Sequence, residues 1–281
     1  MARLLVISAL VSGCLRRFAL ALVVTSLLVA CGGDDDSEGA ASTTSTTERT
    51  ATRDVLEILV TNDDGIAGVG LDALVEALRK EPDVNVTVVA PADDKTGTGG
   101  STTSGSLVST PATTISGYEA TAVEGFPADT IRAALDDLGL KPDLVMSGIN
   151  LGQNLGHLTK VSGTVGAALA AGRRGVPSLA VSQGLGNPPD YAKGVEQALA
   201  WLRSHRDSLK PGVPSAPVTN LNIPTCTSGE VRGVLEVRVA TEGEGEQALA
   251  PSDCGSTATG PDDDVEAFHN GYATLSDLPL S

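Results

Sequence analysis

Apolar positions divide most of the chain into short continuous runs and longer stretches with helical spacing. Continuous runs, typical of buried strands, occur at residues 57–61, 84–90, 144–147, 178–182 and 218–223. Apolar residues three and four positions apart predict helices at 71–80, 128–138, 163–174 and 191–208. Strands and helices that alternate in this way predict a three-layer, Rossmann-like α/β fold, in which crossover helices cover a mostly parallel sheet.

The remaining ordered stretches are less regular. Residues 107–123 predict a pair of strands with a turn at Ser116-Gly117. A strand-like run at 234–239 predicts a C-terminal β extension of the sheet. Order is expected to begin near Val55, so the predicted domain spans residues 55–281.

The N-terminus has the pattern of an export signal. Arg16 and Arg17 precede an apolar run at 18–30, which is too short to span a membrane comfortably. The run ends in Leu28-Val29-Ala30-Cys31, which resembles a bacterial lipobox. This resemblance implies a signal segment at 1–31, a lipid on Cys31 and a lipoprotein anchored to the membrane outside the cytoplasm. An ordinary cleaved signal with a stray cysteine is the alternative.

The stretch at 32–54 contains mainly Gly, Asp, Ser, Thr and Ala, so it is expected to be a disordered tether. The whole chain of 281 residues is 41% hydrophobic and can bury a sizeable core. Its net charge of −16 argues against a long nucleic acid as partner. A small phosphorylated substrate remains compatible with this charge if a metal ion supplies local positive charge.

Two cysteines, Cys226 and Cys254, lie in the part of the chain that is expected to be exported. Disulfides persist outside the cytoplasm, so a bridge between the two is one interpretation. Two free, buried thiols are the other.

Three polar loops follow predicted strands and begin at Asn62, Pro91 and Gly148. Because the carboxyl ends of parallel strands share one edge, these loops are expected to meet there. The first loop is Asn62-Asp63-Asp64-Gly65, whose adjacent carboxylates can supply hard oxygen ligands to Mg²⁺ or Mn²⁺. Gly65 permits a sharp turn after them. An Asx-type turn that caps the next helix is the structural alternative.

The second and third loops offer neutral ligands. Residues 93–101 are rich in Gly, Ser and Thr, whose amides can bind phosphate and whose hydroxyls can bind a metal. Asn150 can offer a carbonyl oxygen to a metal. Ser162-Gly163-Thr164 stands at a predicted helix start, where free N–H groups favour an anion, although plain N-capping is the alternative. His157 is either a nearby acid or base or a surface residue.

In order and spacing, five short blocks of this sequence resemble the SurE family of survival-protein nucleotidases. The blocks are Val60-Thr61-Asn62-Asp63-Asp64-Gly65, Val88-Val89-Ala90-Pro91, Ser147-Gly148-Ile149-Asn150, Asn154-Leu155-Gly156 and Ser162-Gly163-Thr164-Val165. The likeness covers roughly residues 55–278 and is specific as a combination, although no block is specific alone.

The resemblance implies a metal-dependent phosphatase that hydrolyses nucleoside monophosphates, and other phosphate esters as further substrates. It implies a Mg²⁺ or Mn²⁺ ion held by Asp63, Asp64, Thr96 and Asn150, with the two aspartates also catalytic. The implied contacts to substrate and phosphate are Asn62, Gly65, Asn154, Ser162, Gly163 and Thr164. Family members commonly exchange C-terminal segments, which implies a homodimer or homotetramer.

The chain departs from the family pattern beside the site. His157-Leu158-Thr159-Lys160 stands where acidic residues are common, Val161 replaces a usual Tyr, and Thr96 replaces a usual Ser. These changes leave the substrate preference open. Two other functions are considered: a non-catalytic ligand-binding lipoprotein that keeps the metal pocket, and a nucleotide-dependent transferase, which would lack the usual GxGxxG fingerprint.

Overall fold

The computed structural model describes residues 55–209, 217–241 and 247–280. The expected signal segment at 1–31 with Cys31 and the expected tether at 32–54 lie outside the described residues. Within the described ranges, no helix combines the length and the apolar character that crossing a bilayer requires.

The described residues form one nine-stranded sheet in the order β3-β4-β2-β1-β5-β6-β7-β9-β8. The strands are β1 (Leu56–Thr61), β2 (Val84–Pro91), β3 (Ser109–Thr113), β4 (Glu119–Val123), β5 (Leu144–Leu151), β6 (Ser178–Gln183), β7 (Val218–Ile223), β8 (Val234–Glu236) and β9 (Ala273–Asp277). The strands from β4 to β7 in this order are parallel, whereas β3 and β9 run antiparallel to β4 and β7. The predicted mostly parallel α/β sheet is confirmed.

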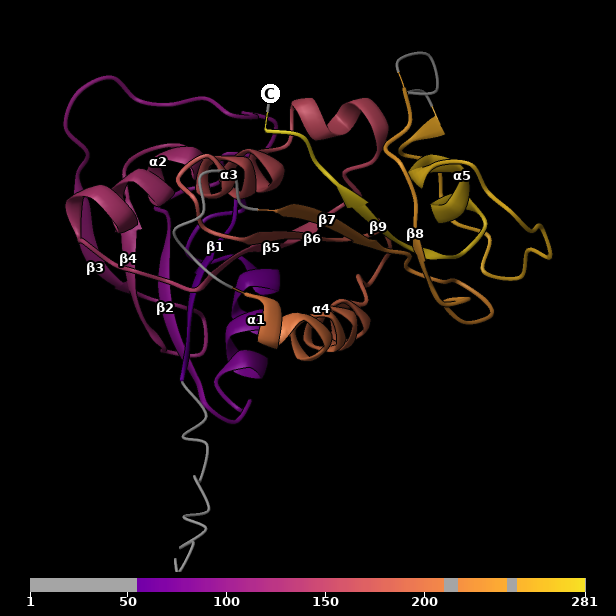
Figure 1. The fold of residues 1–281 in the computed structure, drawn as a ribbon, viewed down its shortest axis with the longest axis horizontal. Helices are drawn as coiled ribbons and strands as arrows, with labels where there is room; N and C mark the ends of the chain where they lie inside the picture. The colour runs from indigo at the N-terminus through magenta and orange to yellow at the C-terminus, as the bar shows by residue number, and fades with distance from the viewer. Residues whose placement is uncertain (1–54, 210–216, 242–246, 281) are drawn as a thin grey trace, which may run out of the picture. The chain divides into compact units, whose positions relative to one another are not determined.

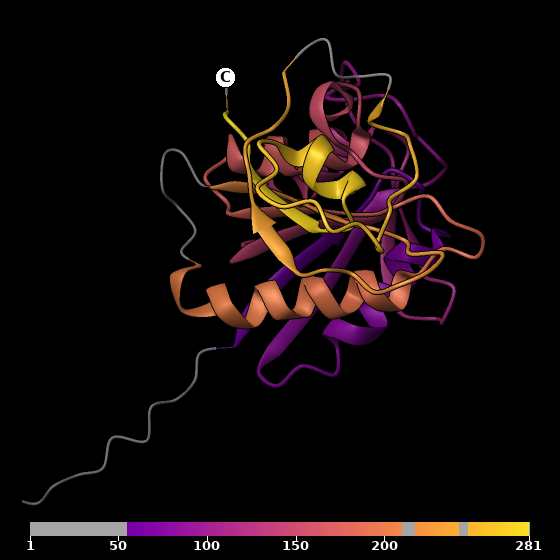
Figure 2. The same cartoon turned by 90° about the vertical axis from the view of Figure 1, so that its right-hand side faces the viewer.

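Helices cover both faces of the sheet (Figure 1, Figure 2). One face packs against α1 (Val69–Leu78) and α4 (Tyr191–His205), and the opposite face against α2 (Pro127–Arg132) and α3 (Gly163–Gly172). Successive residues of a strand point to opposite faces, and both faces of β1 are buried. That is why the central strands read as continuous apolar runs. α3 consists largely of Gly and Ala, which permits close packing against the sheet.

Three predicted elements differ in detail. The helix predicted at 128–138 is α2 followed by a π-helical turn, η1 (Ala133–Asp137). The helix predicted at 191–208 ends as α4 at His205, and a short 3₁₀ turn, η3 (Arg206–Ser208), follows. The prediction of a loop at 149–161 was wrong in part. The strand β5 continues to Leu151, and a 3₁₀ helix, η2 (Gly156–Lys160), occupies the second half of the predicted loop.

The C-terminal region contains more structure than the sequence pattern indicated. The predicted strand at 234–239 is only the short β8, and β9 lies between it and β7. The pattern also missed α5 (Asp264–His269). The strand β9 was missed because two of its buried residues are polar: Thr274 and Ser276 pair with Asn222 and Asn220 on β7. Polar residues on a buried face do not produce an apolar run.

A disulfide connects the C-terminal segment to the end of β7. Cys226 and Cys254 are bonded, with their Cα atoms 5.7 Å apart, and 28 positions separate them in the sequence. Of the two interpretations of these cysteines, the structure contains the bridge. A cross-link of this kind stabilises a fold mainly by restricting the unfolded chain, and the effect grows with the length of the loop.

We therefore predict that replacing both cysteines by serine lowers the free energy of unfolding by about 3 kcal/mol. Urea unfolding of oxidised wild type and of the Cys226→Ser/Cys254→Ser variant measures this difference. Wild type in a reducing buffer serves as the control and should behave like the variant. Identical midpoints for oxidised and reduced wild type would contradict the prediction.

Candidate functional site

The candidate site begins where β1 ends, at Asn62-Asp63-Asp64-Gly65. Asn62 is fully buried, and its Nδ2 donates to the Gly65 carbonyl at 2.9 Å, which closes a tight local turn. Gly65 has φ of 90° and lies against the next loop, where an added Cβ would be 2.8 Å from the Asp93 carbonyl carbon. The conformation and the close approach both require glycine here.

The interpretation of Asp63-Asp64 as a helix cap is wrong. The helix α1 begins only at Val69, its N-cap residue is Gly68, and no side chain caps it. The two carboxylates therefore do not satisfy the first turn of the following helix, and their burial needs another explanation.

Asp63 lies against the N-terminus of α3. Its side chain is 2% exposed, and its Oδ1 accepts a short hydrogen bond from the Thr164 hydroxyl. Gly163 leaves room for this contact, because a Cβ there would lie 2.7 Å from the Asp63 Cβ. Burial raises the pKa of Asp63, while the bonds from Thr164 lower it. The topology has thus brought together two blocks that are about a hundred residues apart, as the sequence predicted.

Among the groups that shift the pKa of Asp64, the one hydrogen-bond donor is its own backbone N–H. Its Oδ2 is buried without a hydrogen-bond partner among the described residues, and so is Oδ1 of Asn62. Burial, followed by the charges of Asp63 and Asp94, raises the pKa of Asp64 to about 7. A carboxylate oxygen that is buried without a donor or a cation is costly. When both carboxyls are ionised, the pair therefore carries negative charge that no described cationic side chain is shown to balance.

A third carboxylate, Asp94, lies in the loop after β2. Its charge acts on both Asp63 and Asp64, and it accepts hydrogen bonds at its Oδ1 from the Thr96 hydroxyl at 2.6 Å and the Thr96 N–H at 2.8 Å. The same loop is tied to the pair, because the Lys95 N–H donates to the Asp63 carbonyl at 2.7 Å. Thr96 is exposed, with its hydroxyl turned to Asp94. Thr96 was the predicted ligand in this loop and Asp94 was not, although Asp94 follows a parallel strand and so belongs to the same edge.

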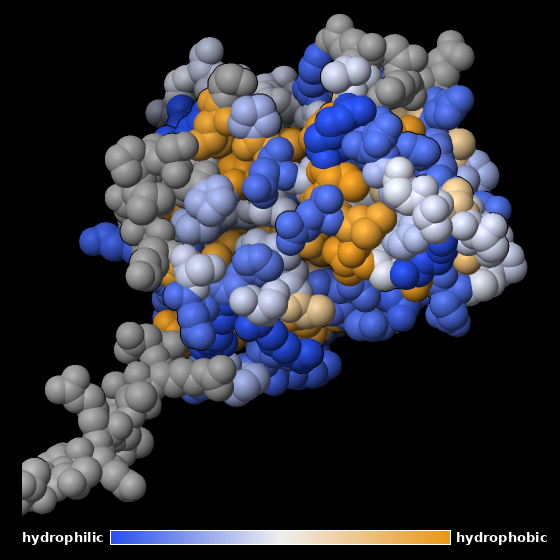
Figure 3. All heavy atoms as spheres, turned by 45° about the vertical axis from the view of Figure 1, so that its right-hand side comes forward, coloured by the Kyte–Doolittle hydropathy of each residue, from blue (hydrophilic) through white to orange (hydrophobic). Residues whose placement is uncertain are grey.

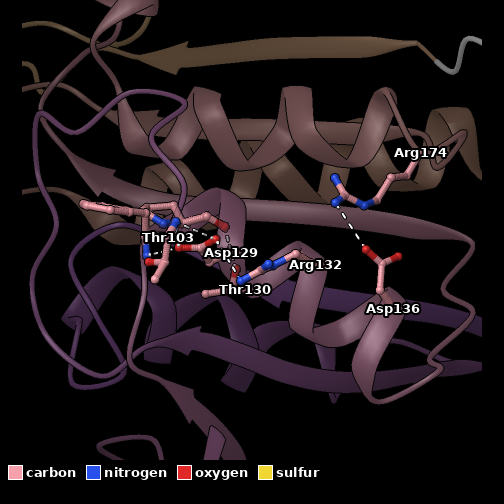
Figure 4. A network of polar contacts seen from close by, with 8 residues as sticks. Thr103, Asp129, Thr130, Arg132, Asp136 and Arg174 are labelled. Atoms are coloured by element: carbon pink, nitrogen blue, oxygen red, sulfur yellow. Dashed lines mark hydrogen bonds and ion pairs between the residues drawn. The ribbon is translucent and has the colours of Figure 1, made fainter. Parts of the chain in front are cut away.

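The Gly-rich part of this loop is held by α2. Asp129 is fully buried and accepts the Thr103 N–H at both carboxylate oxygens, at 3.1 and 2.9 Å (Figure 4). It also accepts the Phe126 N–H at 3.0 Å. One carboxylate therefore fixes the loop to the start of the helix beside the site.

Asn150 and Asn154 lie at and beyond the end of β5. The Nδ2 of Asn150 donates to the Gly152 carbonyl at 2.6 Å, a bond that does not use its carbonyl oxygen. Asn154 is buried and bonded on both sides: its N–H donates to Asn222 at 2.7 Å and its Nδ2 to Ser182 at 2.9 Å. Asn150 thus keeps an oxygen suited to a metal, whereas the Asn154 amide nitrogen already has a partner.

Ser162 does cap α3, because its side chain accepts the Val165 N–H at 3.1 Å. The capping interpretation therefore holds for Ser162, while Thr164 uses its hydroxyl on Asp63. His157 lies on η2 and lines a cavity of about 720 Å³ whose lining includes none of the four predicted metal ligands.

Tyr191 is a site neighbour that the sequence analysis missed. It starts α4, is half-buried, and has a pKa raised to about 12 by burial and then by the charge of Asp64. An added Cβ on Gly70 would lie 1.9 Å from the Ile149 oxygen and 2.9 Å from the Tyr191 ring, so β5, α1 and α4 converge here. Its place after the carboxyl end of β6 is the signal that could have identified it.

The donor set suits a hard divalent cation. Carboxylate, hydroxyl and amide oxygens are the ligands that Mg²⁺ and Mn²⁺ prefer, and two buried oxygens of the first loop lack partners among the described residues. Within the described ranges, no three His, Cys, Asp or Glu residues lie close enough to hold a metal together. Any ion at this edge would therefore need neutral oxygens or water beside the aspartates.

Most of the chain is similar to proteins of a single family. A family model described as "Survival protein SurE" matches residues 58–246. A protein named 5'-nucleotidase SurE from Hyphomonas neptunium is 33% identical over 241 residues, which cover 79% of this chain and 92% of the relative. Another of that name from Brevibacillus brevis is 38% identical over 187 residues, covering 64% and 71%.

The fold has a counterpart among solved structures. The crystal structure of SurE protein from Aquifex aeolicus aligns with a TM-score of 0.64 at 28% identity. The alignment covers 80% of this chain and 94% of that protein.

The raised pKa values predict how the stability of the metal-free protein depends on pH. The folded state holds protons on Asp63 and Asp64 more tightly than the unfolded chain, so the free energy of unfolding should fall as pH rises from about 4 to about 7. Asp64→Asn should remove on the order of 2–4 kcal/mol of this fall. Chemical unfolding at several pH values in the presence of a chelator measures it.

The matched control is Asp207→Asn, which removes the same charge from an exposed position in η3. It should keep the pH dependence of the wild type. If Asp64→Asn and Asp207→Asn gave the same pH profile, the burial of Asp64 could not be the source of the effect.

Proposed function

The chain belongs to the survival protein SurE family, and from this premise we propose that it is a metal-dependent phosphomonoesterase that hydrolyses nucleoside monophosphates. The observation that carries the proposal is the pair of Asp63, which is buried, and Asp64, whose Oδ2 is buried without a partner among the described residues. Within the described part of the chain, no cationic side chain is among the groups that shift the pKa of either carboxyl. A pair left in this state fits a site that a cation completes.

In this proposal Asp63 and Asp64 hold Mg²⁺ or Mn²⁺, assisted by Asn150 and Thr96. A divalent ion supplies Lewis acidity there, by offsetting phosphate charge and making water a stronger acid. Asn150 contributes the carbonyl oxygen that its hydrogen bond leaves unused. Thr96 donates its hydroxyl proton to Asp94, and the lone pairs of the same oxygen could serve the ion.

The phosphate would lie at the N-terminus of α3, where amide donors and the helix dipole favour an anion. Gly163 and Thr164 bring this terminus against Asp63. Asn62 and Gly65 form the turn that carries the two aspartates, through the hydrogen bond between them. Ser162 would contribute indirectly, because its side chain caps α3 and so orders the helix N-terminus at which the phosphate would lie.

Asn154 takes a supporting place in this arrangement. Its N–H and its side-chain nitrogen are both bonded to neighbouring strands, so it orders the loop after Asn150 more directly than it binds substrate. Hydrolysis would then proceed by attack of water on phosphorus, with phosphate and the free alcohol as products.

The test is a Mn²⁺-dependent assay of phosphate release from a nucleoside monophosphate. Asp63→Asn and Asp64→Asn should each lower kcat/KM at least about a hundredfold, because each removes a charged ligand of the ion. Asp207→Asn is the matched control and should retain full activity. Aspartate variants as active as wild type would overturn the mechanism.

The same assay distinguishes the proposed enzyme from the principal alternative, a ligand-binding protein without catalytic activity. That function predicts tight binding of a nucleotide to wild type and no phosphate release with any divalent ion. A family of proteins named as nucleotidases favours the enzyme.

We further propose that the enzyme is exported and anchored outside the cytoplasm by a lipid on Cys31, with 32–54 as its tether. The support is the sequence alone, namely Arg16-Arg17, the apolar run and the Leu-Val-Ala-Cys motif. Cys31→Ser should shift the protein from the membrane fraction to the soluble fraction of expressing cells. An unchanged distribution would overturn the anchor and leave the enzymatic proposal intact.

A further inference from the structure

Three leucines are exposed around the loop that follows Asn150. Leu151, Leu185 and Leu249 have 45%, 49% and 55% of their surface accessible. They come from three segments: the end of β5, the loop after β6 and the segment that contains Cys254. Apolar patches also interrupt the polar surface on the face drawn in Figure 3, where single residues are not identified. Apolar side chains that gather at the surface commonly mark a binding site.

One buried glutamine joins the segments that carry these leucines. Gln153 is 2% exposed, and its Oε1 accepts the Leu185 N–H at 3.1 Å. Its Nε2 donates to the carbonyls of Ala248 at 3.0 Å and Ala250 at 3.3 Å, the two neighbours of Leu249. The three leucines are thus held on one hydrogen-bonded frame.

Two further contacts keep this frame compact. Gly152 approaches Leu185 so closely that an added Cβ would lie 3.4 Å from Leu185 Cδ2. The Gly152 N–H donates to the Gln183 carbonyl at 2.7 Å, which ties the end of β5 to the end of β6. The Cys226–Cys254 disulfide anchors the third segment to the end of β7. The side chains are therefore exposed on an ordered support.

We infer that Leu151, Leu185 and Leu249 form a shelf that receives the base of a nucleoside monophosphate. This inference rests on the proposed function and names the group that the site recognises beyond phosphate. Leu151 directly follows Asn150, and the loop that contains Leu185 leads to Tyr191, which interacts with Asp64. The shelf therefore lies at the same sheet edge as the carboxylates.

The aliphatic character of the shelf indicates which phosphate esters it would favour. Aliphatic side chains cover the face of a planar base through contact area and without hydrogen bonds. The polar groups of the frame are bonded to one another, so those bonds do not read the edge of a base. The shelf should favour esters that carry a base over small esters, and should separate one base from another only weakly.

The test compares two substrates that share the phosphate and differ in the organic group: adenosine monophosphate and glycerol phosphate. In the full chain, Leu151→Ala/Leu185→Ala should raise KM for adenosine monophosphate about five- to tenfold with little change in kcat. KM for glycerol phosphate should stay unchanged. Leu138→Ala, at a position 48% exposed just after η1, is the matched control and should change neither value.

An equal change in KM for both substrates, or no change for either, would overturn the shelf while the phosphatase stands. No change is also the result expected if the leucines bind another protein instead. Wild type that hydrolyses neither ester would overturn the proposed function, and the shelf with it. Leu185→Ala alone gives the same readout if the double variant unfolds, which its thermal midpoint reports.

Discussion

The constraint on which the rest of the site depends is a pair of adjacent carboxylates at the end of β1, of which Asp63 is buried and Asp64 is partly buried. The hydrogen bond from Thr164 offsets part of the free-energy cost of burying the Asp63 carboxylate. One oxygen of Asp64, in contrast, has no partner among the described residues. Evolution rarely keeps a buried charge without a balancing group unless function requires it. In the proposed mechanism, a bound cation would relieve the repulsion between the two carboxylates, so the same pair that destabilises the empty protein would favour metal binding.

Several neighbouring features follow from that constraint. Gly163 is needed because any side chain there would collide with Asp63, and Gly65 because the chain must turn against the next loop. Asp129 holds the Gly-rich loop in place through the Thr103 N–H. The hydrogen bonds of Gln153 join the loop after β5 to the segments that contain Leu185 and Leu249. Buried polar groups therefore fix flexible, glycine-rich segments around a charged centre.

The sequence predicted the central sheet well because its parallel strands are buried on both faces and leave continuous apolar runs. It predicted the meeting of the Asp63 and Thr164 blocks because parallel topology places loops at one edge. It failed for β9, whose buried Thr274 and Ser276 satisfy no apolar pattern. Asp94 and Tyr191 both follow parallel strands at this edge, but many residues do, and the strand order does not show that the charges of these two act on or respond to Asp64.

The most direct test of the central claim is proton release on metal binding. At pH 6, Asp64 is largely protonated in the metal-free protein, because its pKa is about 7. Titrating chelator-treated protein with Mn²⁺ in a weakly buffered solution should therefore raise the thermal midpoint and release up to about one proton per ion bound at the pair. Neither effect should occur in Asp64→Asn to the same extent. Mn²⁺ that leaves the midpoint of wild type unchanged and releases no proton would contradict the account.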